Sequence, residues 1–89
     1  MTVTNNTDQS RYELVEDGYV AYADYRVHGT TLSINYVFSP PELRGKGTAG
    51  RLMQGLMENA KAQSLKVTPI CGYAASWLQR HPEFNDMKA

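Results

Sequence analysis

The sequence predicts an α/β (α+β) fold: a three-stranded antiparallel meander, a helix, a fourth strand parallel to the third, and a C-terminal helix. Two patterns carry this prediction. Residues 11–38 alternate apolar and polar side chains, as half-buried strands do. Residues 49–64 instead repeat apolar side chains at helical spacing. Because a helix between two strands of one sheet makes a right-handed crossover, the fourth strand is expected to run parallel to the third.

Turn residues separate the three strands of the meander. The first strand is expected at Arg11–Glu16 and ends at Asp17-Gly18, a strong hairpin signal. The second is expected over residues 19–27, before the turn His28-Gly29-Thr30. The third follows over residues 32–39, and its alternation predicts that Tyr36 and Phe38 lie in the core.

The second half of the chain contains the helices. Pro40-Pro41 ends the third strand because proline cannot donate to the strand ladder. The long helix is followed by a fourth strand at residues 66–71. A second, short helix is expected at residues 73–80, and Pro82 ends it.

Length and composition predict one small domain. The chain has 89 residues, of which residues 1–9 are polar and expected to form a flexible tail, and residues 10–89 a single domain. Nine basic and nine acidic residues balance, which argues against nonspecific nucleic-acid binding. The sequence shows neither a secretory signal nor an apolar run that would span a membrane, and it has one cysteine. These features predict a cytoplasmic protein without a membrane or nucleic-acid partner.

The most informative segment is residues 39–51, Ser-Pro-Pro-Glu-Leu-Arg-Gly-Lys-Gly-Thr-Ala-Gly-Arg. Its glycines, Gly45, Gly47 and Gly50, lie where a strand gives way to a helix, and they allow backbone N–H groups to converge. A helix N-terminus adds unpaired donors and the positive end of its dipole. Arg44, Lys46 and Arg51 bring positive charge to the same place. The segment therefore predicts a phosphate or pyrophosphate site.

Two common phosphate-binding motifs fit this segment poorly. Residues 45–50 match the dinucleotide fingerprint G-x-G-x-x-G, but that motif directly follows its strand, and an acidic residue ends the next strand. Here six residues separate Phe38 from Gly45, and the next strand ends in Ile-Cys-Gly. The P-loop spacing is also present, but Arg51-Leu52 stands where a P-loop has Lys-Ser/Thr.

A third motif, R-x-x-G-x-A, is matched by Arg44 to Ala49. It resembles the acyl-coenzyme A pyrophosphate loop of the GNAT superfamily of N-acetyltransferases. The order Pro40 to Gly47, a helix, Lys66 to Cys71 and then Arg80 to Phe84 is similar to the small YjdJ-like branch of that superfamily. Many relatives have isoleucine and glycine after the second loop glycine, where this chain has Thr48-Ala49.

The resemblance implies a truncated GNAT-like fold that uses acetyl-CoA as cosubstrate and no metal. Its pyrophosphate would lie on the loop formed by Arg44, Gly45, Lys46, Gly47, Thr48, Ala49 and Gly50, and its pantetheine arm would run past the end of the third strand. Larger members continue into strands that help form the acceptor site. The acceptor pocket is therefore expected to be open or supplied by a partner.

Cys71 is the catalytic candidate. It lies between the fourth strand and the second helix, where a helix dipole favours a thiolate, and it matches the candidate cysteine of YjdJ-like proteins. It would act as a nucleophile or a proton shuttle, and the alternative is a small core residue.

The sequence thus predicts a small N-acetyltransferase that moves an acetyl group to an unidentified amine, which is a small molecule or a protein. The alternative is a noncatalytic coenzyme A-binding or protein-interaction module. The sequence leaves the oligomeric state open.

Overall fold

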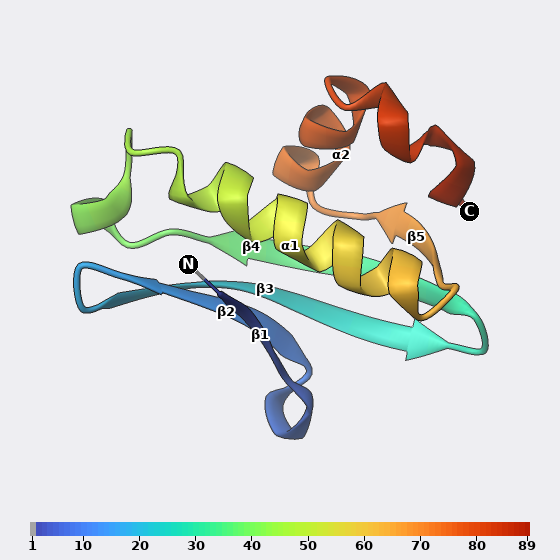
Figure 1. Cartoon of the computed structure of the whole chain (residues 1–89), viewed down its shortest axis with the longest axis horizontal. Helices are drawn as coiled ribbons and strands as arrows, with labels where there is room; N and C mark the ends of the chain where they lie inside the picture. The colour runs from blue at the N-terminus through green and yellow to red at the C-terminus, as the bar shows by residue number, and fades with distance from the viewer. Residues whose placement is uncertain (1) are drawn as a thin grey trace.

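A computed structural model describes residues 2–89, which form a five-stranded sheet with two helices on one face (Figure 1). The strands lie in the order β1-β2-β3-β4-β5. Their bounds are β1 Val3–Asn6, β2 Arg11–Glu16, β3 Tyr19–His28, β4 Thr31–Phe38 and β5 Lys66–Pro69. The α-helices are α1 Thr48–Ala62 and α2 Gly72–Gln79, and short 3-10 helices lie at η1 Thr7–Gln9, η2 Pro41–Leu43 and η3 Pro82–Met87. No helix within residues 2–89 has the length and apolar character needed to cross a membrane.

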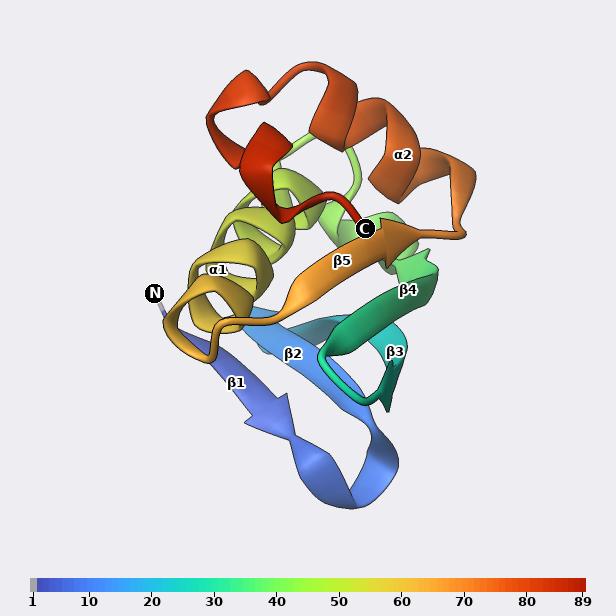
Figure 2. The same cartoon turned by 90° about the vertical axis from the view of Figure 1, so that its right-hand side faces the viewer.

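The strand pairing includes the parallel pair that the sequence predicts for the last strand. Strands β1 to β4 pair antiparallel, whereas β4 and β5 pair parallel from Thr31↔Lys66 to Ile34↔Pro69. Helices α1 and α2 both lie on one face of the sheet, and within residues 2–89 the opposite face carries no α-helix (Figures 1 and 2). The chain then returns to the free side of β5, where the Ala89 N–H donates to the Val67 carbonyl over 3.0 Å.

The core lies between the sheet and the helices. Apolar residues of α1 that recur at helical spacing face inward residues of the central strands, as the sequence pattern predicts. The fully buried members of this core include Leu14, Leu32, Ile34, Leu52, Met53, Leu56, Met57, Val67 and Leu78.

A β-bulge overturns the prediction that Tyr36 and Phe38 lie in the core. Asp24 pairs with Tyr36, but the next residue of β3 pairs with Ile34, so Asn35 has no partner across the ladder. The extra residue reverses the alternation. Tyr36 is therefore 49% exposed, and it packs with Phe38 and Tyr22 on the helix-free face.

The expectation of a flexible tail over residues 1–9 is wrong for the part that the structure describes. Met1 lies outside the described residues, but Val3–Asn6 forms β1, an edge strand paired with β2. The Tyr25 hydroxyl donates to Asn5 Oδ1 over 2.6 Å, and Asn6 Nδ2 donates to a Glu13 carboxylate oxygen over 3.1 Å. The side chains of Asn5 and Asn6 thus form hydrogen bonds with neighbouring strands, and a pattern of alternating apolar residues does not reveal such bonds.

Gly55 gives this edge strand its place against α1. A Cβ at Gly55 would overlap the side chain of Val3, because it would lie only 2.6 Å from the Cβ of Val3. Gly55→Ala is therefore expected to displace β1, even though alanine favours a helix by about 0.5–1 kcal/mol over glycine. Amide hydrogen exchange should accelerate in residues 3–6 and stay slow in β3. Gly72→Ala is the matched control, since a Cβ there meets nothing within 4 Å. Unchanged protection of β1 in Gly55→Ala would contradict this packing.

Candidate functional site

The glycine-containing segment forms a tight loop between β4 and α1. After η2, the chain turns through Arg44 to Gly47, and Gly47 is the N-cap residue of α1. Gly45 and Gly47 both have φ of +79°, in the left-handed region that glycine adopts without steric cost. These two positions therefore need glycine for the path of the loop itself.

The loop presents unpaired backbone donors. Among residues 2–89, no hydrogen bond to a protein acceptor is formed by the N–H groups of Gly45, Gly47, Thr48, Ala49 and Gly50. The loop N–H of Lys46 donates to the Leu43 carbonyl, and α1 begins its own bonding at Arg51. A helix N-terminus carries partial positive charge, so these donors form an anion-binding surface.

A cavity of about 240 Å³ adjoins these donors. It is lined by Ser39, Leu43, Arg44, Gly45, Gly47, Thr48, Ala49, Gly50 and Tyr73. Six of the seven loop residues predicted to bind a cofactor thus lie in one wall, and Lys46 does not. The hydroxyl oxygen of Ser39 is buried without a hydrogen-bond partner in the part of the chain that the structure describes. An orphaned polar atom in a cavity wall indicates a site that a polar ligand atom would satisfy.

Tyr73, which sequence reasoning did not single out, comes from α2 and forms the opposite wall. Its hydroxyl lies 4.0 Å, and Trp77 Nε1 3.7 Å, from the place that a Cβ at Gly50 would take. Burial raises the pKa of Tyr73 above its usual value of 10.0, while Arg80 acts in the opposite direction. Tyr73 therefore presents a protonated hydroxyl to the loop at neutral pH. No local motif marks it, because tertiary packing of α2 on α1 brings it there.

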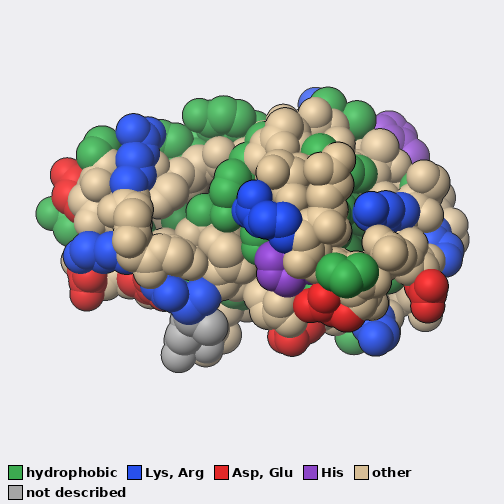
Figure 3. Space-filling model, turned by 90° about the horizontal axis from the view of Figure 1, so that it is seen from above, with side chains coloured by type: hydrophobic (Ala, Val, Ile, Leu, Met, Phe, Trp, Pro, Cys, Tyr) green, Lys and Arg blue, Asp and Glu red, His purple; other side chains and the backbone are tan. Residues whose placement is uncertain are grey.

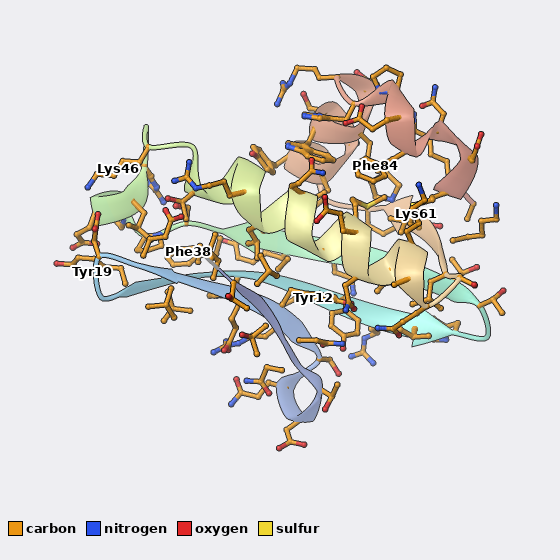
Figure 4. The ribbon with its side chains drawn as sticks, in the orientation of Figure 1. Tyr12, Tyr19, Phe38, Lys46, Lys61 and Phe84 are labelled. Carbon is orange, nitrogen blue, oxygen red and sulfur yellow. The ribbon has the colours of Figure 1, made fainter. Side chains whose placement is uncertain are left out.

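The three loop cations have different partners. Arg44 Nε donates to the Ser39 carbonyl over 3.0 Å, and within residues 2–89 no carboxylate lies within 4.0 Å of its guanidinium. Lys46 Nζ lies 3.1 Å from Asp17 Oδ2 in an exposed pair at the tip of the β2–β3 hairpin (Figure 4). Exposed pairs of this kind contribute little to stability, so an incoming phosphate can replace the Asp17 carboxylate. Figure 3 shows basic side chains at this end of the molecule with acidic ones among them, and further basic side chains over the middle and the opposite end.

Arg51, in contrast, does not add free charge to the loop. Its Nε and Nη2 donate to the two carboxylate oxygens of Glu16 over 2.8 and 2.7 Å. The Thr48 hydroxyl donates to Glu16 over 2.6 Å, and Arg51 Nη2 also donates to the Lys46 carbonyl over 2.9 Å. Glu16, at the end of β2, thereby holds both the loop and the first turn of α1. The positive charge expected from Arg51 is already matched by a carboxylate that lies 35 residues away in the sequence.

This arrangement predicts a dependence of stability on pH. Hydrogen bonds from Arg51, then from Thr48, lower the pKa of Glu16 from 4.5 to about 2. A carboxyl group with a lowered pKa in the folded state stabilises the fold above its unfolded pKa, and this contribution is lost as pH falls from about 4.5 to about 2. The Glu16→Gln variant is expected to lose stability at pH 7 and to show a shallower fall of stability below pH 4.5 than the wild type, measured by urea unfolding.

Glu83→Gln serves as the control, since Glu83 is exposed and, among the described residues, lies in no ion pair. Glu13, whose pKa Arg11 also lowers, continues to contribute a pH dependence in both variants. Identical pH profiles for wild type and Glu16→Gln would show that Glu16 does not hold the loop.

Cys71 lies at a different place from the loop. It is the N-cap residue of α2 and is partly buried against the core. The N–H groups of Ile70 and Cys71 both donate to the Ile34 carbonyl over 3.0 Å, so neither amide is left for a ligand. Cys71 does not line the loop cavity. Within residues 2–89, no three His, Cys, Asp or Glu side chains group together as a metal site would require.

The edge of β4 connects Cys71 with the loop. The pairing of β4 with β5 ends at Ile34, whereas β4 continues to Phe38 with β3 as its strand neighbour. Alternate backbone groups on an antiparallel strand point away from the partner. The segment from Asn35 to Phe38 therefore offers backbone groups along a path from the loop cavity to Cys71.

Comparisons with known proteins bear on this site. A family model described as GCN5-related N-acetyl-transferase matches residues 11–87. Among solved structures, the chain is similar to the NMR solution structure of a GCN5-like "putative N-acetyltransferase" from Staphylococcus aureus, with a TM-score of 0.76 and 21% sequence identity. That similarity covers 98% of this chain and 86% of the other. A search of curated proteins gives no match.

Proposed function

Because the chain belongs to the GCN5-related N-acetyltransferase family, we propose that it binds acetyl-CoA on the glycine loop and transfers the acetyl group to an amine. The observation that carries this proposal is the set of unpaired N–H groups at Gly45 and at residues 47–50. Several backbone donors at a helix N-terminus match a pyrophosphate, which has many acceptor oxygens and negative charge.

The other groups of the cavity fit the same ligand. Arg44 would add a guanidinium without losing an ion pair, and Lys46 would exchange Asp17 for a phosphate. The orphaned Ser39 hydroxyl and the protonated Tyr73 hydroxyl supply hydrogen bonds between the loop and α2. The pantetheine arm would then follow the edge of β4 beyond Ile34, where, among residues 2–89, no strand pairs with this edge and competes for the amide groups of the arm.

Acetyl-CoA supplies a thioester that is already activated toward an amine. The proposed contribution of the protein is to hold that thioester beside the acceptor, which lowers the entropic cost of the reaction. The Ile70 and Cys71 amides are engaged by Ile34, so a donor for the thioester oxygen is expected from the edge of β4 rather than from β5. Cys71 would accept a proton from the attacking amine or carry the acetyl group transiently.

A noncatalytic coenzyme A-binding module is the second candidate. It is favoured by the composition of the loop cavity, whose wall contains binding groups but no carboxylate, histidine or cysteine. A module of this kind would bind the coenzyme at the same loop and leave the thioester intact.

An assay of acetyl transfer to a panel of amines distinguishes the acetyltransferase from the noncatalytic module. The protein is incubated with acetyl-CoA and with propylamine, 1,3-diaminopropane or a lysine-containing peptide, and thiol release and acetylated product are both measured. We expect product above the spontaneous rate for at least one amine. Coenzyme binding without product from any amine would support the noncatalytic module instead.

A further inference from the structure

A second concavity, of about 480 Å³, lies on the helix-free face of the sheet. Its wall includes Asp8 and Ser10, beside Asp24 of β3 and Asn35 and Tyr36 of β4. The turn that carries Asp8 projects from the sheet on the side opposite α1 (Figure 1). The Ser10 carbonyl fixes this turn to the sheet by accepting a hydrogen bond from the Tyr25 N–H over 3.0 Å.

This concavity adjoins the edge of β4 at which we place the thioester. Asn35 is the unpaired residue of the β-bulge, and it directly follows Ile34, whose carbonyl accepts the Cys71 N–H. Ser39, a few residues further along the same chain segment, lines the loop cavity on the helix side. The chain segment from Asn35 to Ser39 therefore contributes to both cavities, with Asn35 and Tyr36 in the concavity and Ser39, just past the end of β4, in the loop cavity.

The charge of the concavity favours a cation. Asp8 and Asp24 outnumber Arg26, so the lining side chains sum to one negative charge. Within residues 2–89, neither carboxylate has a basic nitrogen within 4.0 Å, since Arg11, which faces Asp24 across the strands, pairs with Glu13 instead. The half-exposed ring of Tyr36 adds a face that attracts a cation.

We propose that this concavity binds the acceptor, and that the acceptor is an amine that carries a second ammonium group. This inference rests on the proposed function. Asp8 and Asp24 bind the second ammonium, and the free amine reaches the thioester at the β4 edge. The amine nitrogen forms a C–N bond to the acetyl carbon as the C–S bond breaks. The amine proton passes by way of Cys71 to the departing thiolate, which gives an acetamide and coenzyme A.

The test compares 1,3-diaminopropane with propylamine, which lacks the second ammonium. For the wild type, kcat/KM is expected to be higher for the diamine. Removal of the charge in Asp8→Asn or Asp24→Asn is expected to lower kcat/KM for the diamine about tenfold, the scale of one lost hydrogen bond to a charged group. Propylamine turnover and the Kd for coenzyme A should not change. Asp86→Asn, which removes an exposed carboxylate from η3, is the matched control.

A binding experiment with diaminopropane tests the proposed acceptor site even if the protein acetylates no amine. Diaminopropane is titrated into the coenzyme A-bound protein, and amide NMR signals are followed. Shifts at residues 8–10, 24–26 and 35–36 that Asp24→Asn abolishes support the proposal. Signal shifts at other residues would overturn the proposal. An equal fall of kcat/KM for both amines in the Asp8→Asn or Asp24→Asn variant would also overturn it. A protein that fails to bind coenzyme A at all would instead refute the proposed function.

Discussion

Gly47→Asp is expected to weaken coenzyme A binding about a hundredfold while the fold survives, because a carboxylate beside the pyrophosphate loses hydrogen bonds to charged oxygens and adds repulsion. Gly47 is the N-cap of α1, and its N–H is one of the unpaired donors. A Cβ there would lie 3.1 Å from Arg51 Nη1, a flexible group that can move aside. Isothermal titration calorimetry measures the change in Kd.

Gly29→Asp is the matched control for this variant. Gly29 has φ of +61° in an exposed hairpin turn, and a Cβ there meets nothing within 4 Å. Both variants place an aspartate in the left-handed region at a cost of about 1–3 kcal/mol, but only one lies at the loop. Equal coenzyme affinity in the two variants would place the phosphates away from Gly47.

Cys71→Ser is expected to keep coenzyme binding and to lower acetyl transfer about a hundredfold or more, the usual contribution of a positioned proton-transfer group. The reason is the position of Cys71 between β5 and α2, where its N–H donates to the Ile34 carbonyl beside the exposed edge of β4. The initial rate of thiol release, with the Kd for coenzyme A as control, measures the effect.

Intact-mass measurement separates the two chemical roles of Cys71. A nucleophilic Cys71 accumulates an acetyl group when acetyl-CoA is supplied without an acceptor, whereas a proton shuttle leaves the mass unchanged. Cys71→Ala addresses the structural alternative, since it removes little buried volume. A fully active Cys71→Ala protein would end the catalytic role of Cys71 and leave the coenzyme site intact.

Local patterns predicted most of the elements. The bounds of β2 agree with the prediction, and those of β3, β4 and α2 agree to within one residue. Helix α1 begins one residue earlier than expected and ends two residues earlier, and β5 is shorter because Ile70 and Cys71 leave the strand to bond the Ile34 carbonyl. The parallel pairing of β4 and β5 followed from a general rule of chain handedness and needed no contact information.

The errors have physical causes that lie outside any local pattern. Strand β1 is polar, and its stability depends on hydrogen bonds to Tyr25 and Glu13 and on the absence of a side chain at Gly55. The exposure of Tyr36 depends on one extra residue in β4, and a bulge leaves no mark in the alternation before it.

The candidate site was also predicted only in part, because a local motif indicates its loop but not the contacts of its side chains. The motif predicted which residues form the loop, because its chemistry is carried by the backbone, and six of these seven residues line one cavity. That they bind a cofactor stays a prediction. The roles of their side chains were not predicted, because the partner of Arg51 is Glu16 on a distant strand. Tyr73 likewise reaches the loop only because α2 packs against α1, and the missing hydrogen-bond partner of the Ser39 hydroxyl is a property of the folded chain that no motif indicates.

The central claim is that the backbone of residues 45–50 binds the pyrophosphate of coenzyme A. An amide NMR titration tests it most directly, because each unpaired N–H has its own signal. With coenzyme A we expect saturable shifts at Gly45, Gly47, Thr48, Ala49 and Gly50, and only small shifts at the same concentration of NAD. Loop shifts with NAD and none with coenzyme A, or coenzyme A shifts confined to other parts of the chain, would contradict the claim.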